Sequence, residues 1–327
     1  MPGLCHDCDL TSTKLPNFFV VGAPKAGTTS LYHYLDQHPQ IYTSPIKEPH
    51  YFATEVRQEN CEPELRRQIA RETRRLKEFL AGPMIERRFG RIVTDWEDYL
   101  RLFTNAENES ALGEASVCYL WSQTAPDRIA ETVPDAKILV MFRDPTERAW
   151  SQYLQGLGNG AIRWSLREHV RRNLQHHSKQ FAVHYPFLEF GLYSEQFRRY
   201  LERFEPNVWF GLYEDFRRRP LETYRDICRF LGVADDFSPN MDRRHMEAQV
   251  PRVGLTSWLK RSGVWKFTAG ITPSRLRPLI RRAVVRKPGA THIEPADRRY
   301  LTDFYREDVR KLAGLLNRNL DDWMGIN

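Results

Sequence analysis

NFFVVGAPKAGTTS, residues 17–30, joins a short apolar run to a loop of glycine, proline and lysine and then to three hydroxyl residues. The run Asn17–Gly22 predicts a buried strand, Ala23–Gly27 a turn, and Thr28–Gln37 has the apolar spacing of a helix. At a strand-to-helix turn of this kind, backbone N–H groups point at an anion and the helix dipole favours negative charge. The stretch therefore predicts an anion-binding loop at the carboxyl end of a strand.

The lysine of this loop stands at an unusual place. The phosphate loop of nucleotide kinases and NTPases reads G-x-x-x-x-G-K-[ST]. Gly22 and Gly27 keep the spacing of its glycines, but position 28 is threonine and the lysine is Lys25. An ordinary strand–helix turn is the plain alternative, which the combination of lysine, glycines and hydroxyls disfavours. We expect a loop that binds phosphate but presents its cation from a different point.

Outward from this loop the chain alternates strands and helices. Strands are predicted at Leu112–Ala115, Lys137–Phe142 and Asn207–Leu212, and helices at Asp95–Phe103, Asp127–Thr132, Pro145–Leu154, Ser194–Phe204, Leu221–Leu231 and Pro295–Leu316. This alternation implies an α/β fold with a mostly parallel sheet and helices on both faces. We predict one P-loop-like domain over residues 16–327, with a helical insertion at 55–95, after a flexible N-terminus over residues 1–15.

Composition excludes several classes of protein. Of the 327 residues 41% are hydrophobic, enough for a core, yet the longest apolar runs are far too short to span a bilayer. The N-terminus lacks the pattern of a signal peptide, and Pro2 excludes N-myristoylation. Five cysteines argue against a disulfide framework, and Cys5 with Cys8 forms only half of a zinc pattern. We expect a soluble, cytoplasmic protein with no metal and no membrane partner.

The positive charge is concentrated near the C-terminus. Between Asn240 and Ala290 there are 12 Lys and Arg against two acids, a net +10, so the rest of a chain of net charge +7 carries −3. Such a segment attracts anions, whether nucleotide phosphates, acidic sugars, nucleic acid or a membrane surface. A solvated basic face is the plain alternative. Because no stripe of interleaved aromatics or reader motif is present, we expect no nucleic-acid partner.

A second cluster follows the strand that ends at Phe142. Arg143 stands at the carboxyl end of this strand, where open α/β sheets bind ligands, and Ser151 lies two helical turns further on. A guanidinium and a hydroxyl placed in this way could hold a second phosphate of the same ligand. The plain alternative for Arg-Asp-Pro is a salt bridge and a turn at the end of a strand.

The chain resembles the sulfotransferases that use 3′-phosphoadenosine 5′-phosphosulfate (PAPS). The resemblance rests on FFVVGAPKAGTTSL (18–31), KEPHYF (47–52), GEASVCYL (113–120), KILVMFRDPTERAWSQY (137–153) and Asn207–Phe216 with the Phe-Leu-Gly at 230–232. These blocks follow the family's order over Asn17–Val233. The second block is most similar to that of the heparan-sulfate enzymes and of bacterial carbohydrate or natural-product enzymes.

The resemblance implies how the donor is bound. The loop would hold the 5′-phosphosulfate, with Lys25 near the bridging oxygen, through Lys25, Ala26, Gly27, Thr28, Thr29 and Ser30. Arg143 and Ser151 would hold the 3′-phosphate, which distinguishes this donor from ATP. A basic loop late in the chain would cover the nucleotide, and Lys287 and Gly289 match it best. The product would be 3′-phosphoadenosine 5′-phosphate (PAP), and the family needs no metal for its chemistry.

The resemblance also implies a base on the acceptor side. Glu48 would be this catalytic residue, and burial under neighbouring rings could raise its pKa usefully. His50 is the rival, because its ordinary pKa is nearer neutrality. The plain alternative is a surface ion pair of Glu48 with Lys47. One departure stands out: enzymes of the glycosaminoglycan type carry a lysine where this chain has Ala115, which argues against a heparan-like acceptor.

The sequence thus predicts a sulfotransferase. It would move a sulfuryl group from PAPS to a hydroxyl, or an amine, of a carbohydrate or secondary-metabolite acceptor by in-line displacement, with release of PAP. Two alternatives remain open. One is a P-loop nucleotide kinase, and the other is a non-catalytic basic module that binds nucleic acid or acidic glycans.

Overall fold

The computed structural model describes residues 14–90, 92–178, 180–242, 250–251, 285–286 and 292–326. The chain forms two compact units. The first consists of Met1–Phe142 with Glu195–Arg243, and the second of Arg143–Ser194 with Arg244–Asn327. Among the described residues, no helix is both long enough and apolar enough to cross a membrane.

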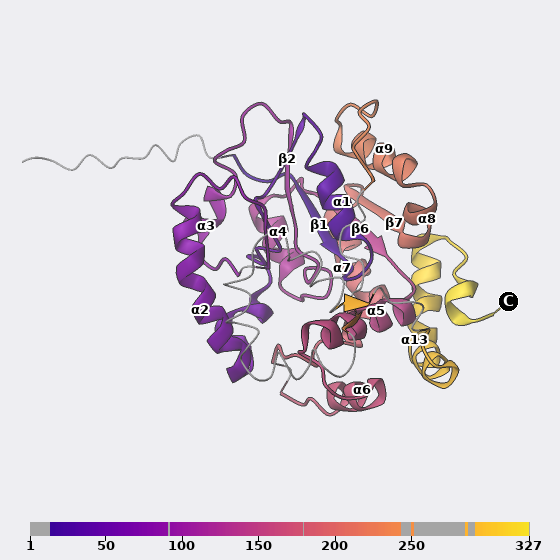
Figure 1. The fold of residues 1–327 in the computed structure, drawn as a ribbon. Coiled ribbons are helices and arrows are strands. Elements are labelled where there is room, and N and C mark those ends of the chain that lie inside the picture. The colour runs from indigo at the N-terminus through magenta and orange to yellow at the C-terminus, as the bar shows by residue number, and fades with distance from the viewer. Residues whose placement is uncertain are drawn as a thin grey trace, which may run out of the picture. The chain divides into compact units, whose positions relative to one another are not determined.

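The first unit is built on a five-stranded sheet with the order β2-β5-β1-β6-β7, in which every neighbouring pair is parallel (Figure 1). The strands are β1 (Phe18–Gly22), β2 (Ile41–Thr43), β5 (Ala111–Ala115), β6 (Lys137–Phe142) and β7 (Val208–Leu212). All residues of β1 and β5 are buried, as expected for strands covered on both faces. The predicted α/β class with a central parallel sheet is confirmed.

The first unit also contains α-helices. They are α1 (Thr28–Leu35), α2 (Pro63–Leu80), α3 (Trp96–Arg101), α4 (Ala125–Thr132), α7 (Tyr193–Phe204), α8 (Tyr213–Arg218) and α9 (Pro220–Leu231). Helix α7 packs on the sheet through Phe197, whose ring meets Phe142 of β6 edge-on at 5.2 Å and Phe210 of β7 at 5.9 Å. Helix α1 contacts α9, which in turn contacts β7. Two short 3₁₀ turns, η2 (Thr54–Val56) and η3 (Gln58–Asn60), precede α2.

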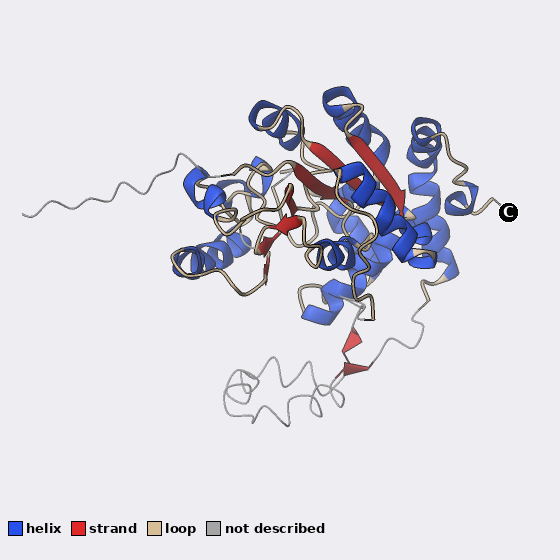
Figure 2. Cartoon of the chain, turned by 90° about the horizontal axis from the view of Figure 1, so that it is seen from above, coloured by secondary structure: helices blue, strands red, loops and turns tan. Residues whose placement is uncertain are grey.

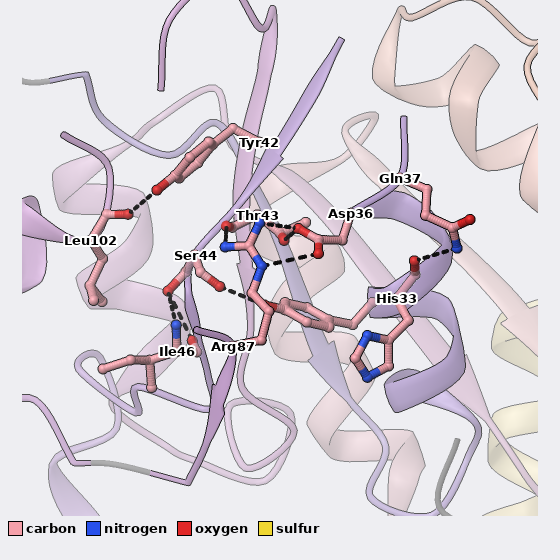
Figure 3. A network of polar contacts seen from close by, with 10 residues as sticks. His33, Asp36, Gln37, Tyr42, Thr43, Ser44, Ile46, Arg87 and Leu102 are labelled. Carbon is pink, nitrogen blue, oxygen red and sulfur yellow. Dashed lines mark hydrogen bonds and ion pairs between the residues drawn. The ribbon is translucent and has the colours of Figure 1, made fainter. Parts of the chain in front are cut away.

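A two-stranded parallel sheet presents the KEPHYF block. Strand β3 (Ile46–Lys47) pairs with β4 (Arg88–Phe89). Arg87, next to β4, holds Asp36 at the end of α1 with two nitrogens and donates to the carbonyl of Thr43 in β2 (Figure 3). The guanidinium thereby joins the helix that follows the anion loop to the strands that carry Lys47.

The second unit is mainly helical. Its elements are α5 (Pro145–Asn159), α6 (Leu166–Leu174), η4 (Glu189–Gly191), α13 (Pro295–Leu316), η5 (Asp321–Met324) and the antiparallel pair β8 (Val250–Pro251) and β9 (Val285–Arg286), red in Figure 2. Helix α13 packs on α5 and η5. The buried Tyr305 of α13 donates to the carbonyl of Leu188, and the buried Arg148 of α5 donates to that of Phe187.

Candidate active site

The loop after β1 has the predicted strand–turn–helix form. Gly27 is the N-cap of α1 with φ 82°, and a Cβ at this position would lie 3.0 Å from the ring of Tyr213. Both observations require glycine. The Ala23 N–H donates to the carbonyl of Met141 in β6, which fixes the start of the loop against the sheet.

The first turn of α1 is suited to an anion. The first four N–H groups of a helix have no partner within the helix, and no side chain caps α1 at Gly27. Thr28, Thr29 and Ser30 occupy this turn, directly after Lys25 and Ala26. Because no acid stands in this first turn, the helix dipole favours a bound anion. The loop lies at the carboxyl end of the middle strand of the sheet, where open α/β sheets bind ligands.

Glu48 lies directly after β3 and is fixed by the end of β5. Its N–H donates to the carbonyl of Ala115 at 2.8 Å. Glu48 and His50 both have positive φ, 67° and 59°. For residues other than glycine such a conformation costs of order 1 kcal/mol each, and persists where surrounding contacts fix it.

The Glu48 carboxylate pairs with a buried cation. Lys47 Nζ lies 2.7 Å from Glu48 Oε1, and the lysine side chain is 1% exposed against 28% for the glutamate. Burial acts to raise the pKa of Glu48, but the charge of Lys47, with smaller contributions from neighbouring groups, outweighs it, so the pKa lies below its ordinary value. The expectation of a raised pKa for Glu48 is wrong, because the residue before Glu48 is a buried lysine whose charge outweighs the effect of burial. The ion pair with Lys47 exists, but it is buried on the lysine side.

His50 is a neutral neighbour of this carboxylate. Its Nδ1 lies 3.0 Å from Cys118 Sγ, and its Nε2 lies 3.7 Å from Glu48 Oε2. Burial is the main cause that lowers the pKa of His50, so the ring is uncharged near pH 7. The first unit thus brings Lys25, Glu48 and His50 together: the charge of Lys25 acts on the Glu48 carboxylate, and His50 stands beside it.

Arg143 and Ser151 belong to the second unit. Arg143 directly follows β6, and Asp144 caps α5 by accepting from the Thr146 N–H at 2.8 Å. Arg143 Nη2 lies 3.8 Å from Glu147 Oε2, and its carbonyl accepts from the Tyr193 hydroxyl. Ser151 is half-buried on α5. The capping turn and ion pair of the plain alternative are therefore present, and the phosphate-binding role of Arg143 and Ser151 stays a prediction. Lys287 and Gly289, predicted to cover the nucleotide, lie outside the described residues.

One buried carboxylate of the first unit was not singled out from the sequence. Glu114 of β5 is 1% exposed and accepts from the hydroxyls of Ser116, Tyr119 and Tyr99. Burial is the main cause that raises the pKa of Glu114, to about 7. An acid between apolar residues of a buried strand, followed two positions later by serine, is the signal that could have found it.

Comparison with known proteins identifies the family. The model of the family described as "Sulfotransferase family" matches residues 16–237, about two thirds of the chain. The chain belongs to the sulfotransferase family. The predicted resemblance is confirmed, and neither the kinase nor the non-catalytic binding module is favoured.

Relatives of known name agree with this assignment. The chain is 30% identical over 196 residues to carbohydrate sulfotransferase 15 of Rattus norvegicus, covering 49% of this chain and 31% of that protein. It is 25% identical over 317 residues to bifunctional heparan sulfate N-deacetylase/N-sulfotransferase 2 of Homo sapiens, covering 94% of this chain and 30% of that protein. The chain thus spans about a third of the length of these curated relatives.

A solved sulfotransferase has the same fold. The crystal structure of a sulfotransferase from Alicyclobacillus acidocaldarius matches with a TM-score of 0.68 and 29% identity, over 95% of this chain and 99% of the other. The match covers nearly the whole of both chains. The arrangement of sheet, anion loop and helices is therefore that of a known sulfotransferase fold.

Proposed function

We propose that this protein transfers a sulfuryl group from PAPS to a hydroxyl, or an amine, of a carbohydrate or small metabolite, with release of PAP. One observation carries the proposal. The anion loop and the Glu48 carboxylate belong to the same compact unit, and the Lys25 charge acts on Glu48. A cation for the donor and an acceptor for a proton are the two groups that sulfuryl transfer needs, and the family assignment supports this chemistry.

Residues of the loop would bind the donor. The backbone N–H groups and hydroxyls of Thr28, Thr29 and Ser30 suit phosphate and sulfate oxygens, and Lys25 would offset the charge that develops on the bridging oxygen as it leaves. Catalysis in transfers of this type is mainly positioning and electrostatic stabilisation. We infer further that Arg143 and Ser151 hold the 3′-phosphate and that Lys287 and Gly289 cover the nucleotide.

Glu48 would take the proton of the acceptor. Its carboxylate is 28% exposed and stays ionised at neutral pH because of Lys47, so it can accept a proton without first losing one. His50 is uncharged and could also accept, but its two ring nitrogens already face Cys118 and Glu48. We therefore assign the base to Glu48 and a supporting role to His50.

A small metabolite or a carbohydrate other than heparan sulfate suits the acceptor side. Ala115 follows Glu114 where glycosaminoglycan enzymes carry a lysine, so a cation that would meet an anionic sugar is replaced by a methyl group. The relatives are named for carbohydrate and for heparan sulfate N-sulfation, which supports a sugar acceptor with either a hydroxyl or an amine. A cytoplasmic location stays a prediction that cell fractionation checks.

A titration with PAP tests the donor. Saturable binding in the micromolar range is expected for the wild type, with a loss of at least tenfold in Lys25→Ala and in Arg143→Ala. Lys311→Ala, which removes an exposed lysine of α13, is the matched control. Absence of saturable PAP binding, or affinities unchanged by both substitutions, would contradict the proposal, and Mg²⁺-dependent ATP turnover would instead favour a kinase.

Transfer assays with labelled donor test the base. Glu48→Gln is expected to abolish transfer while PAP affinity stays within about twofold, because the carboxylate acts on the acceptor and not on the nucleotide. His50→Ala is expected to retain measurable transfer. If His50→Ala abolished transfer and Glu48→Gln did not, the assignment of the base would be reversed.

A further inference from the structure

Three hydroxyls donate to the buried carboxyl group of Glu114. The Tyr99 and Tyr119 hydroxyls donate to its Oε1 at 3.0 and 2.8 Å, and the Ser116 hydroxyl donates to its Oε2 at 2.6 Å. All four side chains are buried. The three donors come from α3 and from the segment after β5, so the carboxylate is a point where separate parts of the first unit meet.

Two of these hydroxyls also accept hydrogen bonds from the backbone of the turn that carries Glu48. A hydroxyl has one proton, so a hydroxyl that donates to Glu114 offers its oxygen as an acceptor. Ser116 Oγ accepts from the His50 N–H at 3.1 Å, and the Tyr119 oxygen accepts from the Phe52 N–H at 3.2 Å. Glu114 therefore fixes where both hydroxyl protons point, and each hydroxyl oxygen accepts from the backbone of the turn.

The same turn contains two strained residues. Its backbone is held through the N–H groups of every second residue. The Glu48 N–H donates to the Ala115 carbonyl, and the N–H groups of His50 and Phe52 donate to the two hydroxyls. Between these anchors Glu48 and His50 have positive φ. A backbone in this region is kept by contacts that fix it. Two of the N–H anchors here go to hydroxyls that bind Glu114, while the carbonyls of Pro49 and Tyr51 accept from the Val93 N–H and from Arg128.

We propose that Glu114 is a positioning residue for the transfer reaction, acting through the Ser116 and Tyr119 hydroxyls to fix the turn that presents Glu48 and His50. The proposal rests on the proposed function for its effect on catalysis, but its structural part does not. In its ionised form Glu114 accepts from all three hydroxyls. An amide at this position offers N–H groups where one oxygen was, and one hydroxyl then loses its acceptor.

Hydrogen exchange tests the structural part without any activity. In Ser116→Ala and Glu114→Gln, a peptide covering residues 46–53 is expected to exchange at least tenfold faster, with little change in the peptide of α9. Tyr99→Phe is the matched control, because it removes a buried hydroxyl that donates to Glu114 without accepting from the turn. Equal protection in all four proteins would overturn the proposal, whether or not the protein transfers sulfate.

Kinetics test the catalytic part. Glu114→Gln and Ser116→Ala are each expected to lower kcat by about 10- to 100-fold with PAP affinity changed less than twofold. The double variant is expected to lose no more than the worse single variant, because both act on one path. Losses of kcat that multiply in the double variant, or an equal loss of kcat in Tyr99→Phe, would overturn the catalytic part of the proposal. If Glu114→Gln does not fold, Ser116→Ala and Tyr119→Phe give the same comparison. A wild type that binds no PAP would refute the function and leave the exchange result standing.

Discussion

Lys25 illustrates how one side chain can matter for chemistry and little for stability. It stands in the loop before α1 and holds no position in the hydrophobic core. We expect Lys25→Ala to lower turnover by about 10²- to 10³-fold, the size of effect seen when a group that stabilises developing charge is removed. Its melting temperature is expected to stay within about 2 °C of the wild type. A transfer assay with thermal unfolding checks both, with Lys311→Ala as control, and unchanged turnover would contradict the role.

Lys47 is expected to set the pH range of activity. The pKa of Glu48 is lowered, so the reactive carboxylate is present above this pKa and is lost as the pH falls through it. Lys47→Met removes the nearest cation and leaves burial to raise the pKa. The acidic limb of the pH profile of kcat/KM should therefore move to higher pH, whereas Lys311→Met should leave it in place. A profile that did not move would show that Glu48 is not the group being titrated.

At this scale the sequence predicted the residues that a motif marks and missed those that depend on pairing. Lys25, Glu48 and His50 stand in contiguous blocks of sequence, and their roles stay predictions. Glu114 lay inside a quoted block, but its role depends on which hydroxyls the fold brings to it from α3 and from the end of β5. The direction of the Glu48 pKa shift was predicted wrongly for the same reason, since the burial of Lys47 depends on the fold of the sheet.

At the scale of elements, segments with strong apolar periodicity could be predicted from the sequence. The predicted bounds of β6 and α13 agree with the structure, and the apolar faces of α7 and α9 are buried. Strand β2 has three residues and α8 six, too few to show a period, and neither was predicted. In the predicted helical insertion at 55–95, α2 covers only Pro63–Leu80, and Arg88–Phe89 form β4 by pairing with β3, which is distant in sequence.

The contact of Asp36 with Arg87 is the element-scale device that most directly supports the site. It joins the end of α1 to the β3–β4 sheet, so it ties the anion loop to the strand before Glu48. Arg87→Ala should cost about 1–2 kcal/mol in the free energy of unfolding, as for a partly exposed charged hydrogen bond, and lower turnover more than PAP affinity. Urea unfolding checks the first part. Arg219→Ala, which removes an exposed ion pair with Glu222, is the control and should cost less than about 0.5 kcal/mol.

At the scale of the whole molecule, the uneven charge of the chain is a property that the sequence alone establishes. The segment of net charge +10 contains Lys287 and Gly289 and falls largely outside the described residues, so its predicted contact with the nucleotide stays a prediction. The sheet order could not be derived from the sequence either. Nothing in the strands themselves states that β5, far along the chain, lies between β1 and β2.

The stability of the molecule should reveal the ionisation of Glu114. Burial raises the pKa of this carboxyl from 4.5 to about 7, so the folded protein keeps a proton that the unfolded chain releases. Stability from this group is complete below about pH 4.5 and is lost as the pH rises through 7. The loss is at most about 3 kcal/mol at 1.36 kcal/mol per pKa unit. The ionised form of Glu114 accepts the hydrogen bonds that position the Glu48 turn. Forming it in the folded protein therefore costs stability.

Urea unfolding of the wild type and Glu114→Gln at pH 5 and pH 8 measures this cost. The amide does not titrate. From pH 5 to pH 8 the free energy of unfolding of the variant should therefore rise by about 2–3 kcal/mol relative to that of the wild type, whatever the pH-independent cost of the substitution. Groups that titrate alike in both proteins, His50 among them, cancel from this difference in the free energy of unfolding. The pKa values of Tyr99, Tyr119 and Cys118 are raised well above 9, and that of Glu48 is lowered, so these groups keep their charge across the window. A difference that is the same at both pH values would show that Glu114 does not change its charge there, and the carboxylate would then hold its hydroxyls without any cost that pH can expose.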